Sequence, residues 1–121
     1  MQNLNMKIWF FTVSTIALLF GVFFIIFGLK VLPLPNEVLI PWESALYGAI
    51  MVGWSATLLL IGGIAFSRQD PELKRALWVG LALWLFVEAA ASAYFKVWFN
   101  VGVDAAVLML FSVPLLYHRR K

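Results

Sequence analysis

Four long runs of apolar residues constrain the fold of this chain more than any other feature. They cover approximately residues 8–29, 44–66, 76–95 and 101–117. A helix needs roughly 20 residues to cross a bilayer, and all four runs come near or pass that length. The last run is the shortest, and residues 98–100 can extend it. The sequence therefore predicts an all-α integral membrane protein with four transmembrane helices.

The composition supports this fold class. Of the 121 residues, 64% are hydrophobic and only 12% are charged, which leaves too little polar surface for a soluble domain of this size. Lys7 precedes the first run as in a secretory signal, but the run is too long and no small-residue cleavage site follows before Pro33. We read it as a retained helix. The connections are short, so the single domain 1–121 is predicted to be an up-down bundle.

Basic residues are divided unevenly between the predicted loops and orient the chain. Lys30 and Lys96 fall on one side, and the other seven fall at the two ends of the chain and in the second connection. The positive-inside rule then places both termini in the cytoplasm, and we expect the protein in the bacterial inner (plasma) membrane. Aromatic residues form two predicted interfacial belts, the inner with Trp9, Trp78 and Tyr117, the outer with Trp42, Tyr94 and Trp98.

The two longer connections differ in character. Three prolines, Pro33, Pro35 and Pro41, predict an extended outer loop over residues 30–43. In the cytoplasmic connection, Asp70 is predicted to cap the third helix, with Pro71 at its first position and Glu72 complementing the helix dipole. The following Lys74 and Arg75 are expected to anchor at lipid headgroups.

Glu88 is the first candidate for function because it lies in the middle of the third apolar run. A carboxylate at membrane depth is costly unless it is neutralised, paired or hydrated, so it points to function. Ligand binding, proton binding and contact with another protein are all open roles. A structural role would need a hydrogen-bond partner on another helix, among Thr12, Ser14, Thr15, Ser55 and Thr57.

Further candidates lie toward the outer surface. Glu88 is roughly 12 Å inward from Lys96 along its helix, while Glu43 and Asp104 lie near the outer ends of the second and fourth helices. These acids are expected to line an outward-facing vestibule, with Lys96 and Asn100 at its rim and with aromatic walls formed by Tyr47, Trp54 and Trp84.

Plainer interpretations of these residues stay open. Glu43 and Asp104 can simply offset the positive ends of helix dipoles, and Asp104 can also pair with Lys96. Trp54 and Trp84 can be packing residues.

The sequence lacks the patterns of most catalytic and metal chemistry. It has no cysteine and a single histidine, His118, at the end far from the acids. It shows no nucleophile–histidine–acid pattern, metal-ligand cluster or phosphate-binding loop. We therefore expect no catalytic residues, no cofactor and no metal. The net charge of +3 comes from cytoplasmic flanks, so nucleic acid is not an expected partner.

The stretch 18–32, LLFGVFFIIFGLKVL, resembles the first helix of DoxX-like membrane proteins. That resemblance implies a small four-helix membrane protein. The chain is also similar in size and helix count to small multidrug-resistance transporters, but its first helix lacks the essential acid of that family.

Two functional hypotheses follow. The first is a binding or accessory subunit of a membrane assembly, partnered by the lipid bilayer and by copies of itself or other membrane subunits, because small-residue stripes suit lateral helix contacts. The alternative is an oligomeric small transporter or channel in which Glu88 binds a proton or a lipophilic cation, since aromatic walls beside an acid suit such a ligand.

Overall fold

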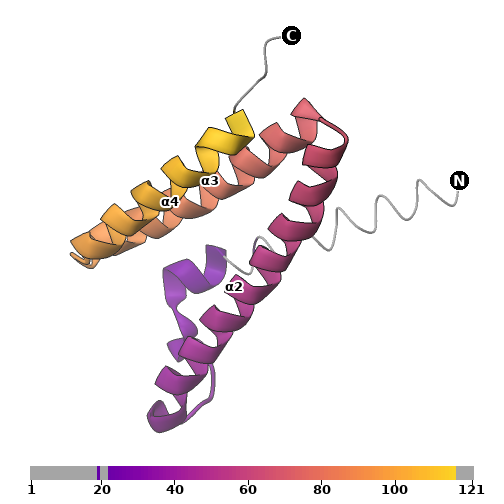
Figure 1. The fold of residues 1–121 in the computed structure, drawn as a ribbon. Coiled ribbons are helices and arrows are strands. Elements are labelled where there is room, and N and C mark those ends of the chain that lie inside the picture. Colours follow the sequence, from indigo (N-terminus) through magenta and orange to yellow (C-terminus); the bar gives the residue numbers. More distant parts are fainter. Residues whose placement is uncertain (1–18, 20–21, 117–121) are drawn as a thin grey trace, which may run out of the picture. The chain divides into compact units, whose positions relative to one another are not determined.

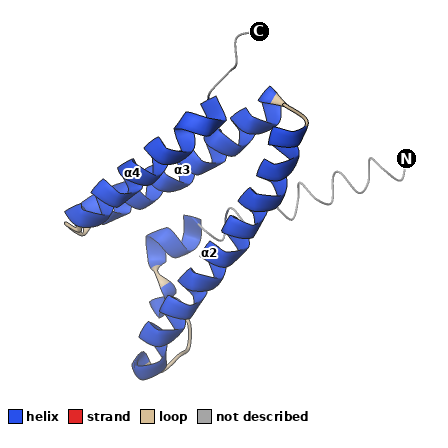
Figure 2. Ribbon diagram, viewed as in Figure 1, coloured by secondary structure: helices blue, strands red, loops and turns tan. Residues whose placement is uncertain are grey.

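The computed structural model describes residue 19 and residues 22–116. All regular structure in this part of the chain is helical (Figure 2). A short 3-10 helix η1, Leu29–Val31, precedes α2 (Asn36–Ser67), α3 (Pro71–Tyr94) and α4 (Trp98–Leu116). Each of the three α-helices is long and apolar enough to cross a membrane, which confirms the predicted fold class at this level.

The predicted first helix, 8–29, falls mostly outside the described residues. Residues 22–27 are helical. Their helix ends at Gly28, which has a φ of 70° and donates its N–H to the carbonyl of Phe24 at 2.9 Å. Glycine suits this left-handed position because it has no Cβ. The count of four helices, the bundle and the cytoplasmic termini remain predictions.

The chain divides into two compact units, Met1–Met51 and Val52–Lys121. The helix α2 runs through the division, so its first half belongs to one unit and its second half to the other. In the first unit, the rings of Phe23 and Phe27 lie 4.8 Å apart and Leu39 is buried. The second unit holds α3, α4 and the end of α2.

The start of α2 corrects one prediction. Residues 36–43 are helical, whereas Pro41 led us to expect an extended loop there. The helix starts earlier because the carbonyl of Pro35 accepts from the N–H groups of Val38 and Leu39, at 3.0 and 3.1 Å. Within this helix Pro41 removes one backbone donor, and its fixed φ is compatible with the helical backbone.

The start of α3 confirms the predicted cap. The Asp70 side chain accepts from the N–H groups of Glu72 and Leu73, both at 3.0 Å, and Pro71 takes the first helical position. Two of the first free N–H groups of the helix are thereby satisfied. The local sequence was sufficient to locate this helix start.

Both turns in the second unit close with the same backbone motif. At the end of α2, the N–H of Asp70 donates to the carbonyl of Ala65 at 3.0 Å, with Gln69 at a φ of 51°. At the end of α3, the N–H of Val97 donates to the carbonyl of Ser92 at 2.8 Å, with Lys96 at a φ of 61°. This is the Schellman arrangement, and here both left-handed positions hold residues other than glycine.

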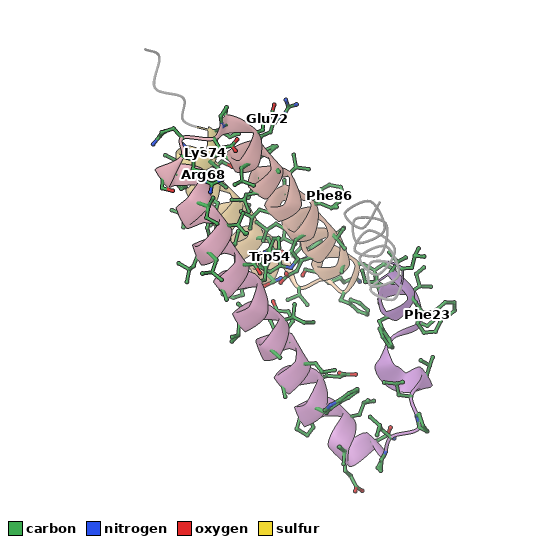
Figure 3. The ribbon with its side chains drawn as sticks, turned by 90° about the vertical axis from the view of Figure 1, so that its right-hand side faces the viewer. Phe23, Trp54, Arg68, Glu72, Lys74 and Phe86 are labelled. Atoms are coloured by element: carbon green, nitrogen blue, oxygen red, sulfur yellow. The ribbon has the colours of Figure 1, made fainter. Side chains whose placement is uncertain are left out.

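Lys74 differs from its predicted role as a headgroup anchor. Its side chain is buried against the α2–α3 turn, with Nζ 4.4 Å from the centre of the Phe66 ring and 3.2 Å from the Gln69 side-chain oxygen. Figure 3 shows Lys74 beside this turn, near Arg68. The ammonium group therefore stabilises the turn, while Arg75 is exposed.

The helices α3 and α4 lie side by side and run in opposite directions (Figure 1), joined by residues 95–97. Their apolar contacts form a core in the second unit, into which Ala65 of α2 also packs. The buried members of this core are Ala65, Leu77, Leu81 and Leu115. The antiparallel α3–α4 hairpin positions the polar residues described next.

Candidate functional site

A cluster of four polar side chains lies between α3 and α4, near the turn that joins them. At its centre is the amide nitrogen of Asn100, on the first turn of α4. This nitrogen lies 2.9 Å from the Ser92 hydroxyl, 3.3 Å from a Glu88 carboxylate oxygen and 3.3 Å from an Asp104 carboxylate oxygen. We call Glu88, Ser92, Asn100 and Asp104 the polar cluster.

The Asn100 amide has fewer donors than the cluster has acceptors. An amide nitrogen carries two hydrogens, whereas three oxygens lie within hydrogen-bond distance of it. The two hydrogens cannot each make a separate hydrogen bond to all three oxygens at once, so at least one oxygen depends on a different donor. The Ser92 hydroxyl can also donate, whereas an ionised carboxylate can only accept.

Burial differs within the cluster. Asp104 is only 4% exposed, whereas Glu88, Ser92 and Asn100 are partly exposed. All four lie inside helices that are long and apolar enough to cross a membrane. The cluster therefore combines a nearly inaccessible acid with a second acid that is more open to its surroundings.

Trp54 on α2 and Trp84 on α3 form an aromatic pair one helical turn from Glu88. Their rings meet edge to face with centroids 6.4 Å apart, and the Trp54 ring also lies over Gly80. Both tryptophans pack against the apolar core. Gly80, Trp84 and Glu88 are spaced four residues apart, so Trp54 covers the face of α3 that carries Glu88 one turn further on.

The indole nitrogen of Trp54 is inaccessible to solvent and has no hydrogen-bond partner among the described residues. A buried donor of this kind carries a desolvation cost, and buried polar groups in proteins are usually satisfied. The aromatic pair therefore combines packing with one buried donor that no described residue satisfies.

The structure brings together those predicted site residues that belong to the second unit. Glu88 and Asp104 share the polar cluster, and Trp54 and Trp84 form the aromatic pair. Glu43 and Tyr47 lie on the part of α2 that belongs to the first unit.

The structure also shows which residues bond to the acids. The Asp104 carboxylate accepts from the Asn100 amide, whereas the sequence had suggested a pair with Lys96. Of the hydrogen-bond partners considered for Glu88, Thr57 bonds within its own helix, to the carbonyl of Gly53 at 2.9 Å. Thr12, Ser14 and Thr15 are outside the described residues.

Sequence reasoning underestimated Asn100 and did not include Ser92 among the site residues. The signal was present in the spacing around the turn. Ser92 and Asn100 are each four residues from Lys96, and Glu88 and Asp104 are each eight residues from it. An antiparallel helical hairpin centred on Lys96 brings such equidistant residues to the same level.

In the described part of the chain, no group of three or more His, Cys, Asp and Glu side chains is arranged to hold a metal ion. The polar cluster has two carboxylates, one amide and one hydroxyl. These groups can accept hydrogen bonds from a positive group, and the carboxylates can also pair with its charge.

Comparison with known proteins gave no match: no family model matches the chain, and neither the curated proteins nor the solved structures contain a significant match to it. The resemblance of residues 18–32 to DoxX-like proteins therefore remains an expectation from sequence.

Proposed function

We propose that this protein is a small membrane-embedded binding protein, acting as an accessory subunit of a membrane assembly, and that its polar cluster binds a positively charged group. The observation that carries the proposal is the meeting of two carboxylates on one amide nitrogen, that of Asn100. Both oxygens lie 3.3 Å from the same nitrogen, so the distance between the Glu88 and Asp104 oxygens is at most twice that value. Two acids so close inside an apolar hairpin favour a positive group beside them.

The neighbouring side chains support an organic cation as the ligand class. Trp54 and Trp84 present aromatic surface next to the face that carries Glu88. An aromatic ring attracts a cation placed over its face, and this attraction strengthens where water is excluded. The cation can belong to a free ligand or to a side chain of another subunit.

The two connections between α3 and α4 support binding over transport. Glu88 lies on α3 and Asp104 lies on α4. The two helices are joined by the short turn at residues 95–97 and, toward their other ends, by a hydrogen bond of 2.8 Å between Trp78 and Ser112. Alternating access usually moves one part of a protein against another around the site. A transporter built on Glu88 would therefore need a second copy or another subunit.

Cation binding can be tested on purified protein in phosphatidylcholine nanodiscs by titration with tetraphenylphosphonium, a lipophilic cation, and with sodium. Tryptophan fluorescence reports binding, since Trp84 is one turn from Glu88. We expect a saturable response to tetraphenylphosphonium in the wild type, and a response that needs at least ten times more ligand in Glu88→Gln and Asp104→Asn. Glu72→Gln, which changes an exposed acid in the first turn of α3, is the matched control and should respond like the wild type. Equal responses from all four proteins would reject the site.

A flux measurement separates the accessory role from the transport alternative. The wild-type protein is reconstituted into phosphatidylcholine vesicles, and movement of tetraphenylphosphonium is followed with an ion-selective electrode. Binding without flux beyond that of protein-free vesicles is the expected result. Flux that requires Glu88 would instead establish the oligomeric transporter.

A further inference from the structure

The turn between α3 and α4 carries a continuous set of exposed aromatic side chains. The exposed fraction is 81% for Tyr94, 73% for Phe95, 66% for Trp98 and 83% for Phe99. The rings of Tyr94 and Phe95 meet edge to face, with centroids 5.1 Å apart. Exposed aromatic residues gathered at the tip of a hairpin indicate a contact surface. We call residues 94–99 the aromatic turn.

Lys96, at the centre of the aromatic turn, is held at a backbone cost. Its φ of 61° lies in the left-handed region, where glycine is the usual residue. Its side chain is exposed. A lysine at a position that suits glycine better implies that its charge or its long side chain has a use, because backbone strain of this kind often marks a functional position.

Helix length places the aromatic turn at the edge of a bilayer. The helix α3 has 24 residues and α4 has 19, lengths of about 36 Å and about 28 Å. The hydrocarbon core of a bilayer is about 30 Å thick, so a hairpin that spans it brings its turn to the headgroup boundary. Tryptophan and tyrosine concentrate at that boundary, and lysine extends its ammonium group toward the phosphates.

We infer that the aromatic turn is a phospholipid anchor, in which the rings of Tyr94 and Trp98 lie at the boundary between headgroups and acyl chains and Lys96 pairs with a lipid phosphate. The inference goes beyond the proposed cation binding and depends only on the hairpin spanning a membrane. The anchor also fixes the depth of the polar cluster. Asn100 is four residues from Lys96, and Glu88 and Asp104 are eight residues from it. At a helical rise of about 1.5 Å per residue, the cluster then extends from just below the headgroups to roughly 12 Å inside them.

Depth can be measured with spin labels on single cysteines, because the chain has no cysteine of its own. Phe95→Cys tests the turn and Met109→Cys, 70% exposed on α4, is the matched control. In bilayers of phosphatidylcholine and phosphatidylglycerol, the ratio of oxygen to nickel-chelate accessibility rises with depth. We expect a headgroup value at residue 95 and a ratio several times higher at residue 109.

Two other results at residue 95 would overturn the anchor. A label that behaves as in bulk water would place the turn beyond the lipid. A label shielded from both oxygen and the nickel chelate would mean that a protein, either a partner or a second copy, covers the turn. Neither result would affect the tetraphenylphosphonium titration, so failure of the anchor and failure of the cation site are distinguishable.

The phosphate contact of Lys96 has its own test. Solid-state NMR can measure dephasing of lysine 15Nζ signals by 31P in the same bilayers, in phosphate-free buffer, with Lys96→Gln to assign the signal. We expect a dephased lysine signal that is missing from the variant. No loss of dephased signal in the variant, or dephasing that appears only after inorganic phosphate is added, would overturn the lipid contact.

Discussion

The indole N–H of Trp78 on α3 donates a hydrogen bond of 2.8 Å to the hydroxyl of Ser112 on α4. That hydroxyl donates in turn to the backbone carbonyl of Leu108 at 2.6 Å. Pro114 lies just beyond, inside α4, where it removes one backbone donor and weakens the helix locally. The Trp78–Ser112 contact therefore fastens the weakened end of α4 to α3, far from the turn.

Removing the Ser112 hydroxyl should destabilise the hairpin. In Ser112→Ala the partly buried Trp78 N–H loses its acceptor, and an unsatisfied buried donor costs about 1–3 kcal/mol. The free energy of unfolding can be measured by titration with sodium dodecyl sulfate in mixed micelles. Ser112→Thr keeps a hydroxyl and should stay close to the wild type. An unchanged free energy in Ser112→Ala would show that this contact adds no stability.

Asn100 should be energetically coupled to Glu88. Its amide donates toward both carboxylates, so Asn100→Ala removes a donor that the acids share. A double-mutant cycle with Glu88→Gln, read from the same unfolding titration, should give a coupling of about 0.5–3 kcal/mol. Additive effects of the two substitutions would mean that the amide and the carboxylate do not interact.

Glycine should stabilise the α3–α4 turn more than the α2–α3 turn, although both hold a residue at positive φ. Lys96→Gly relieves left-handed strain of about 1–2 kcal/mol, offset in part by the larger backbone entropy of glycine. Gln69→Gly also relieves strain, but it removes a side chain that bonds the Phe66 carbonyl at 2.9 Å and the Lys74 ammonium at 3.2 Å.

Unfolding titrations of the two glycine variants test this difference directly. Lys96→Gly should be more stable than the wild type, and Gln69→Gly should gain less or lose stability. Equal gains would show that the Gln69 side chain contributes nothing to its turn.

The cap of α3 should be measurable in the same way. Asp70→Ala removes the acceptor for the N–H groups of Glu72 and Leu73, and loss of such a cap costs about 0.5–2 kcal/mol. Asp70→Ser keeps an acceptor oxygen and should recover most of the loss. If alanine and serine have the same effect, the side chain does not act as a cap.

Structural features that depend only on residues close together in the sequence were predictable. The Asp70–Pro71 start of α3 follows from local cap chemistry, and the apolar runs predicted the three long helices. The extension of α4 back to Trp98 was also foreseen. Pro41 was misleading because the effect of a proline depends on its position within the helix, and here it lies near the start of α2.

Features that depend on packing between helices were predictable only in part. Glu88 and Asp104 were expected to share a vestibule, and they share the polar cluster. Asn100 was expected at the rim but lies at the centre, because the contact of α3 with α4 decides which side chain fills the space between two acids. The burial of Lys74 depends in the same way on Phe66 and Gln69, which belong to the end of α2 and the turn.

The central claim is that Glu88 and Asp104 form one cation site. The most direct test compares the dissociation constant of tetraphenylphosphonium for the wild type, Glu88→Gln, Asp104→Asn and the double variant, all in the same nanodiscs. One shared site predicts that each single substitution weakens binding at least tenfold, and that the double variant is little weaker than either single variant. Two independent effects that multiply in the double variant, or wild-type affinity in either single variant, would contradict it.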